Sequence, residues 1–233
     1  MKYLGQTLFL LVALCNSLLS ADGMVVDKVY HPYVLPNERE FEWRIASHDL
    51  DVGHLLMHRL GYGVAISESV SIETYLIGER DGSGNFDLRS YEVEARWMMT
   101  EQGQYWADWG MLFELEKEKS ADNWETTTAL IMEKELGKSS LTLNLSAIYE
   151  WGEAIESEWE SEFRAQYRYR WIPELQPAIE VYTGENYQGI GPAVVGNKRF
   201  DGQKQLKWEA GLIFEVGHND KNHTFRLSLE YEF

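Results

Sequence analysis

TFRLSLEYEF, residues 224–233, ends the chain and decides its fold. Apolar side chains occupy every second position of this stretch, and the positions between them hold charged or hydroxyl side chains. Because successive side chains of a β-strand point to opposite faces, the pattern predicts a strand with one apolar face and one polar face. A strand that is charged on one side and ends in an aromatic residue is unusual for the core of a soluble protein. Its apolar face would consist of Phe225, Leu227, Leu229, Tyr231 and Phe233.

This strand resembles the closing strand of bacterial outer-membrane β-barrel proteins. In that family the terminal Phe, with aromatic residues before it, is also the signal that the barrel-assembly machinery reads. The resemblance therefore implies that the five apolar residues of the strand form an assembly signal and that the assembly machinery is a partner. It also implies the outer membrane of a Gram-negative bacterium as the location, with outer-membrane lipid around the wall. The small porin-like barrels of solute-uptake families, including those linked to aromatic-compound degradation, are the first group to compare.

The opposite end of the chain predicts export. Met1 and Lys2 give a positive start, residues 4–19 are mostly apolar, and the small residues Ser20 and Ala21 follow. This order is typical of a cleavable secretory signal. We therefore expect three parts: a signal peptide over residues 1–20, a periplasmic N-terminal lead-in over residues 21–37 and a transmembrane β-barrel over residues 38–233.

The single cysteine, Cys15, lies inside the expected signal peptide. The mature chain would then have no disulfide and no thiol chemistry. A lipoprotein would use Cys15 as its modified residue, but the bulky Leu14 stands where that modification expects a small side chain. An ordinary cysteine of an apolar segment is the favoured interpretation.

Composition excludes several classes of protein. No apolar run after residue 21 approaches the length of about 20 residues that a spanning helix needs. A membrane barrel places its apolar residues at alternate positions, so the mean hydropathy of −0.39 agrees with one. The net charge is −17, and it becomes −18 when Lys2 leaves with the signal peptide. This surplus of carboxylates argues against nucleic acid as a partner and against polybasic attachment to anionic lipid.

The alternating pattern recurs along one domain and predicts about twelve strands. An even number of strands brings both ends of a barrel to the periplasmic side. The predicted fold is therefore all-β, a transmembrane up-and-down antiparallel β-barrel of about 12 strands. Alternation is regular over residues 38–46, 88–99, 108–116, 141–151, 162–171, 206–216 and 224–233, and weaker over residues 54–65, 70–79, 124–135, 177–185 and 190–200.

A soluble lipocalin-like barrel or a sandwich would also alternate, with its apolar face turned inward. Two features favour lipid on the outside instead. Strands of about nine or more residues match a tilted membrane crossing, and aromatic residues recur near strand ends, as interfacial girdles do. These aromatic residues are Trp97, Trp106, Trp124, Tyr149, Trp151, Tyr169 and Trp171.

The function then depends on the inward face, which is crowded with charges. About twelve strands should enclose a narrow lumen. One interpretation is a channel for small solutes, in which acidic clusters favour cations and Arg164, Arg168 and Arg170 form a basic ladder. The alternative is a closed structural or surface-binding barrel whose interior charges pair with one another. The residues expected to line the lumen are Glu92, Glu94, Arg96, Glu114, Glu116, Glu133, Glu162, Arg164, Arg168, Arg170, Glu209, Glu215, Arg226 and Glu230.

Histidines do not predict a metal site. His54 and His58 would share one face of a strand but lie about 13 Å apart, too far for one ion. His218 and His223 could approach Asp220 at a turn, although a solvated turn is the favoured interpretation. We expect no metal and no cofactor.

A hydrolase at the barrel rim is the remaining alternative, since outer-membrane enzymes of similar architecture use a His with a Ser or an acid there. The consecutive residues Ser47, His48 and Asp49 come nearest to that requirement. Neighbours in an extended loop cannot all point at one another, so we do not expect an enzyme. A monomer is the expected state, with a small solute as a possible partner.

Overall fold

The computed structural model describes residues 25–50, 53–80, 84–153, 155–216 and 222–233. Twelve antiparallel strands form one closed barrel, which confirms the predicted fold class and strand number. The strands are β1 (Arg39–Leu50), β2 (Gly53–Ala65), β3 (Val70–Arg80), β4 (Phe86–Met98), β5 (Asp108–Glu118), β6 (Asn123–Leu136), β7 (Ser139–Gly152), β8 (Glu158–Tyr169), β9 (Gln176–Thr183), β10 (Gln188–Arg199), β11 (Gln205–Glu215) and β12 (His223–Glu232). No helix among the described residues is long and apolar enough to cross a membrane.

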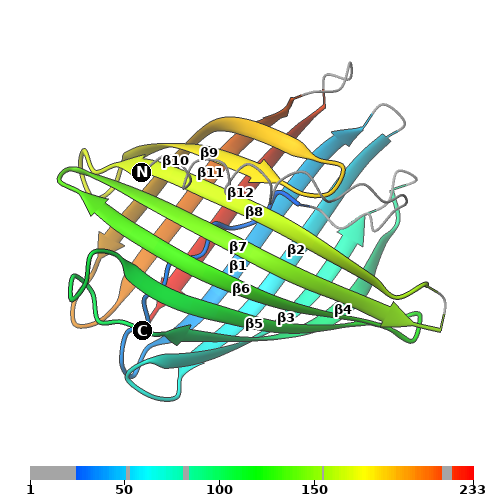
Figure 1. The fold of residues 1–233 in the computed structure, drawn as a ribbon, viewed down its shortest axis with the longest axis horizontal. Coiled ribbons are helices and arrows are strands. Elements are labelled where there is room, and N and C mark those ends of the chain that lie inside the picture. The colour runs from blue at the N-terminus through cyan, green and yellow to red at the C-terminus, as the bar shows by residue number, and fades with distance from the viewer. Residues whose placement is uncertain (1–24, 51–52, 81–83, 154, 217–221) are drawn as a thin grey trace, which may run out of the picture.

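Each strand pairs with its neighbours in the sequence, and the last strand closes the barrel against the first (Figure 1). The closing register runs from Glu40 opposite Glu232 to Asp49 opposite His223. The C-terminal stretch is therefore the closing strand, as its resemblance to outer-membrane barrels implied.

The barrel has two ends, which the closing strands define. We call the end where β1 begins and β12 ends the near end, and the opposite end the far end. Two tight turns at the near end contain Gly137 and Gly202, with φ angles of 69° and 74°. This left-handed backbone conformation is accessible to glycine at little cost, so both turns can be short.

The two faces of the wall differ as the sequence predicted. Outward-pointing Phe41 and Leu145 are 53% and 58% exposed, whereas inward-pointing Glu42 and Glu94 are 2% and 1% exposed. A lipocalin-like barrel would show the reverse, with apolar side chains inside. The exposed apolar outer wall therefore excludes that alternative.

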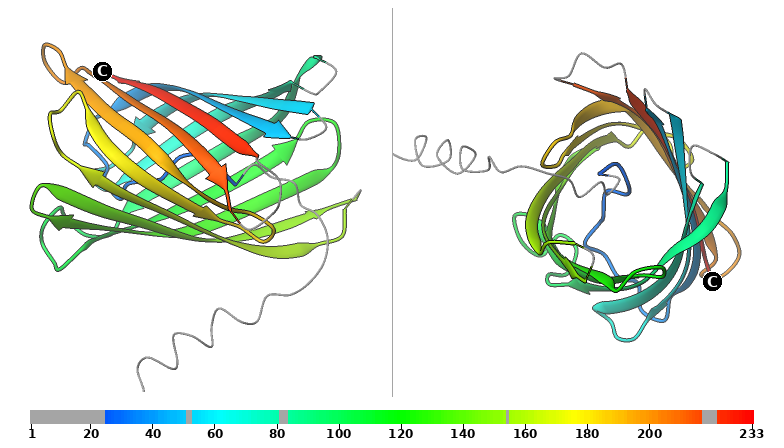
Figure 2. Two further views of the ribbon diagram at one scale, coloured as in Figure 1. Left: turned by 90° about the horizontal axis from the view of Figure 1, so that it is seen from above. Right: turned by 90° about the vertical axis from the view of Figure 1, so that its right-hand side faces the viewer.

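The chain that precedes β1 lies inside the barrel. Val26, Val29 and Tyr30 are at most 4% exposed, and their neighbours are side chains of the wall. Figure 2 shows this segment, in dark blue, within the ring of strands when the barrel is viewed along its length. We call residues 25–36 the inserted segment. The sequence indicated an extended lead-in here, but nothing in it indicated a position within the lumen.

Candidate functional site in the barrel interior

The inserted segment is fixed to the closing seam of the barrel by Lys28. Its Nζ lies 2.9 Å from Glu42 Oε1 on β1 and 2.9 Å from Glu230 Oε2 on β12. The Arg164 guanidinium on β8 donates to the Lys28 carbonyl oxygen at 3.1 Å. Lys28 is 5% exposed, so these contacts lie in an environment of low dielectric, where charge-assisted hydrogen bonds are strong.

Asp27 supplies the opposite charge beside Lys28. Its carboxylate accepts from Arg44 on β1 at 2.8 Å and lies 3.7 Å from Arg59 on β2. Burial alone would raise the pKa of the Asp27 carboxyl, but these two guanidinium groups hold this pKa well below its usual range. Asp27 therefore stays ionised as the counter-charge of the interior arginines.

Tyr30 ties the segment to the opposite side of the wall. The Asn144 side chain on β7 accepts from the Tyr30 backbone N–H at 2.7 Å and donates to its carbonyl oxygen at 2.9 Å. The Tyr30 hydroxyl donates to Glu94 on β4 at 2.9 Å. Further along, His31 contacts Glu133 at 2.5 Å and Tyr33 donates to Asp108 at 2.8 Å. The segment thus crosses the lumen and contacts strands on both sides.

Apolar contacts also hold the inserted segment against the inner wall. Val26 and Val29 pack against Tyr182 and Ile213, and Tyr30 packs against Leu112, Ala129 and Ile131. A Cβ atom at Gly110 would lie 2.9 Å from Cβ of Pro32, closer than ordinary contacts allow. Gly110 therefore gives the segment the room it needs beside β5.

Cavities lie on both sides of the inserted segment. The far cavity, of about 480 Å³, is lined by Val25, Val26 and Tyr30 together with wall residues near the far end. At the near end, cavities of about 290 Å³ and 210 Å³ are lined by Leu35 and Glu38 among others. The far cavity shares no lining residue with the near ones. The inserted segment and its ion pairs therefore separate the two parts of the interior.

The residues expected to line the lumen are all on the inward face or near its ends. Seven of them are buried: Glu92, Glu94, Glu133, Glu162, Glu209, Arg226 and Glu230. The other seven are partly buried: Arg96, Glu114, Glu116, Arg164, Arg168, Arg170 and Glu215.

The three arginines expected to form a basic ladder each have a carboxylate partner. Arg164 lies 2.6 Å from Glu162, Arg168 lies 3.3 Å from Glu133, and Arg170 lies 2.7 Å from Glu135. Arg226 on β12 is a further interior arginine and is more deeply buried than these three. It contacts Glu180 and lies 2.9 Å from Glu209. The interior arginines thus act as partners of carboxylates.

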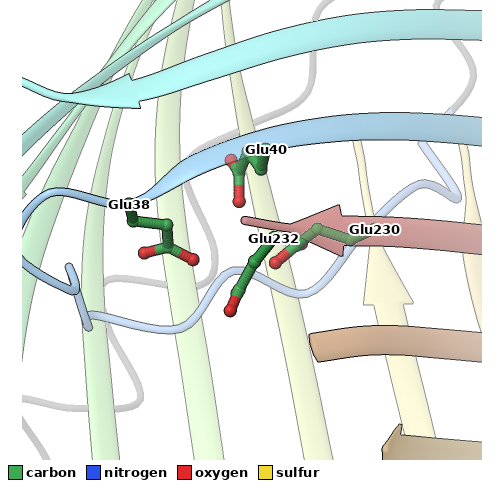
Figure 3. A group of neighbouring side chains, drawn as sticks. All are labelled: Glu38, Glu40, Glu230 and Glu232. Carbon is green, nitrogen blue, oxygen red and sulfur yellow. The ribbon is translucent and has the colours of Figure 1, made fainter. Parts of the chain in front are cut away.

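A cluster of four carboxylates lies at the near end of the closing seam (Figure 3). Glu38 directly precedes β1, Glu40 lies in β1, and Glu230 and Glu232 lie in β12. One oxygen of each lies within 4.8 Å of the others. Cations already offset this charge. Lys207 contacts three of the four, and Arg96 lies 3.7 Å from the remaining Glu40.

The rim residues Ser47 and His48 point away from each other. The Ser47 hydroxyl lies 2.9 Å from Nε2 of His54, whereas Nδ1 of His48 lies 2.6 Å from the Thr224 hydroxyl on β12. Adjacent positions of a strand face opposite sides, so Ser47 and His48, two of the three consecutive residues considered for a hydrolase, do not form one site. The side chain of Asp49 lies outside the described part of the chain. His58 stacks on Trp43 on the outer wall. His218 and Asp220 lie outside the described residues.

Sequence reasoning missed the interior partners that come from the inserted segment. Asp27, Lys28 and Tyr30 lie in a stretch without a period-two pattern, where charged residues are usually solvated. It also left Glu73 and Glu180 out of the lumen set, although both are at most 2% exposed. Their positions within alternating strands could have indicated them.

No protein-family model and no curated protein matches the chain. Among solved structures, the KdgM porin in complex with disordered oligogalacturonate is similar with a TM-score of 0.55 and 14% identity, covering 83% of this chain and 99% of that chain. The COG4313 outer membrane channel from Pseudomonas putida F1 is similar with a TM-score of 0.59 and 14% identity, covering 89% of this chain and 100% of that chain. This likeness is one of fold: the chain has the closed-barrel architecture of these two outer-membrane proteins.

Proposed function

We propose that this protein is an outer-membrane channel for small solutes, with a narrow, acidic lumen that favours cations. The observation that carries the proposal is the separation of the far and near cavities by one pass of chain. A barrel interior with a cavity on each side of a single segment differs from an interior that packed side chains fill completely. Displacement of the inserted segment would join the cavities into a path, and the two proteins of similar fold are named as a porin and a channel.

Cation preference is proposed from the charges that face the far cavity. Glu114, Glu116, Glu125, Glu150 and Glu160 line this cavity, together with Glu162. Three arginines, Arg59, Arg89 and Arg164, line it as well. A lumen in which carboxylates outnumber cationic side chains raises the local concentration of cations and repels anions.

Location and assembly belong to the same proposal. The N-terminal stretch would direct export as a signal peptide, and the exposed apolar wall would face outer-membrane lipid. The apolar residues of β12 would serve as the assembly signal, and the protein would function as a monomer.

The test is single-channel conductance of the refolded, heat-modifiable protein in a planar bilayer, with a KCl gradient across it. Wild type should show rare openings with a cation-selective reversal potential. The double variant Asp27→Asn with Lys28→Met removes the charged anchors of the inserted segment, so its open time should rise about tenfold. A control change, Glu68→Gln, lies in an exposed near-end turn and should leave both open time and selectivity unchanged.

A closed structural barrel is the second candidate, and the paired interior favours it. Arg44 alone contacts Asp27, Glu42 and the Tyr30 hydroxyl, so the segment and wall form one charge network. This candidate predicts no conductance from either wild type or the double variant, even when both migrate as folded barrels. Stable steps from the double variant would exclude it.

A further inference from the structure

A row of directly opposed glutamates crosses the inner wall beside the far cavity. Glu92 on β4 pairs in register with Glu116 on β5, which pairs with Glu125 on β6. Glu125 pairs with Glu150 on β7, and Glu150 pairs with Glu158 on β8. Like charges directly opposite each other on neighbouring strands destabilise a sheet. The row therefore needs an opposing charge.

The protein supplies little of that charge itself. Among the described residues, Glu114, Glu116, Glu125 and Glu150 make no ion pair within 4.0 Å. The near-end cluster of Figure 3 differs, because Lys207 lies among its carboxylates and takes the place that a bound cation would occupy. Within the part of the chain that the structure describes, the far acidic cluster thus has a single cationic contact, from Arg59 to Glu92.

Three carboxylates at the β4–β5 end of this row have the spacing of cation ligands. Glu92, Glu114 and Glu116 each place one oxygen within 4.8 Å of the other two. Oxygens bound to one Ca²⁺ lie about 2.3–2.6 Å from the ion, so they are separated by no more than about 5 Å. Glu114 and Glu116 also line the far cavity, which gives an ion a route to the cluster.

Glu92 provides a separate indication of a ligand. Its side chain is fully buried, and its Oε2 accepts from the Arg59 guanidinium at 2.7 Å. Its Oε1 is also buried but has no hydrogen-bond partner among the described residues. A buried carboxylate oxygen without a partner is costly. When all three carboxylates are ionised, they leave two negative charges in excess of the one guanidinium, which one divalent cation would neutralise.

We infer that Glu92, Glu114 and Glu116 form a binding site for a divalent cation of the Ca²⁺ class. An all-oxygen ligand set suits a hard cation, and Ca²⁺ accepts irregular geometry with water in the remaining positions. The inference rests on the proposed function, since it gives the cation-favouring lumen a specific site. A bound ion would join β4 to β5 and lie beside the path of permeating cations.

The test is calorimetric titration of CaCl₂ into the metal-free, folded barrel in detergent. Wild type should bind one ion per barrel, and Glu114→Gln should weaken the affinity at least tenfold, because it removes a ligand while keeping the side-chain shape. Glu232→Gln in the near-end cluster is the matched control, and its affinity should stay within twofold of wild type. Heat-modifiable migration checks the fold of each variant, and Glu116→Gln replaces Glu114→Gln if the latter does not fold.

Two results would overturn the site: Ca²⁺ affinity equal in wild type and Glu114→Gln, or a heat of binding that a titration with NaCl reproduces at the same ionic strength. Neither depends on conduction. A barrel that binds Ca²⁺ through Glu114 but never conducts contradicts only the channel, whereas a barrel that conducts in KCl with a chelator but lacks this binding contradicts only the site.

Discussion

Nζ of Lys28 lies 2.9 Å from Oε2 of Glu230, although the two residues are 202 positions apart in the sequence. The same ammonium group contacts Glu42, so it touches both strands of the closing seam from inside. The start of the described chain therefore lies across the place where the barrel closes. In the folded barrel, the inserted segment and the closing seam stabilise each other.

The first prediction concerns this contact. Lys28→Met keeps the length of the side chain but leaves Glu42 and Glu230 without their shared partner, and loss of one member of a buried ion pair costs about 3 kcal/mol or more. Arg44 and Lys207 also contact these carboxylates. We therefore expect a loss of unfolding free energy near the lower limit of about 3 kcal/mol. Urea unfolding followed by heat-modifiable migration would measure the change. Lys138→Met, in an exposed near-end turn, is the control and should leave the midpoint unchanged.

The second prediction concerns pH. Burial alone would lower the pKa of the Lys28 ammonium, but Glu230 and Glu42 raise this pKa well above its usual value. A raised folded-state pKa means that the stabilisation is complete below the unfolded value of about 10.4 and is lost as pH rises through the folded value. The stability difference between wild type and Lys28→Met should therefore be constant from about pH 7 to 10 and shrink only above that range. A difference that already shrinks between about pH 7 and 9 would contradict the assignment.

The sequence predicted the wall much better than its contents. Period-two alternation is local, so Phe225 and Tyr231 could be assigned to a strand and to its outward face without knowledge of any partner. The inserted segment has no such period, and its anchors become clear only when Lys28 meets Glu230 and Tyr30 meets Asn144 in the closed barrel. Pairing between residues more than 100 positions apart is a property of the closed barrel, which single positions do not reveal.

The third prediction tests the anchor of Tyr30. Asn144→Ala removes both hydrogen bonds to the Tyr30 backbone and leaves its buried N–H unpaired, at a cost of about 1–3 kcal/mol. The inserted segment should then leave the lumen more often. Both the rate of limited proteolysis and the channel open time should therefore increase. Ser146→Ala, two positions along the same inward face of β7, should change neither quantity. Equal behaviour of the two variants would show that Asn144 does not hold the segment.

The fourth prediction concerns the buried arginine of the last strand. Arg226 is 3% exposed and contacts both Glu180 and Glu209, so Arg226→Met would leave two carboxylates without their cation. We expect a loss of about 3–5 kcal/mol in the free energy of unfolding. Adding Glu180→Gln to that variant should restore part of the loss, because it removes one uncompensated charge. No recovery in the double variant would show that packing, and not charge, sets the contribution of Arg226.

The last prediction separates the assembly signal from the stability of the barrel. Phe233 stacks on Phe41 with ring centroids 5.6 Å apart, so its removal also takes away an aromatic contact at the seam. Such a pair contributes about 0.5–1.5 kcal/mol, too little to unfold a barrel. If Phe233 is read as a signal, Phe233→Ala should reduce the amount of folded protein in the outer membrane of cells about tenfold while refolding in detergent stays near wild type. Phe214→Ala, an outward aromatic on β11 that is 48% exposed, is the control and should assemble normally in cells. Equal losses in cells and in detergent would assign Phe233 a structural role alone.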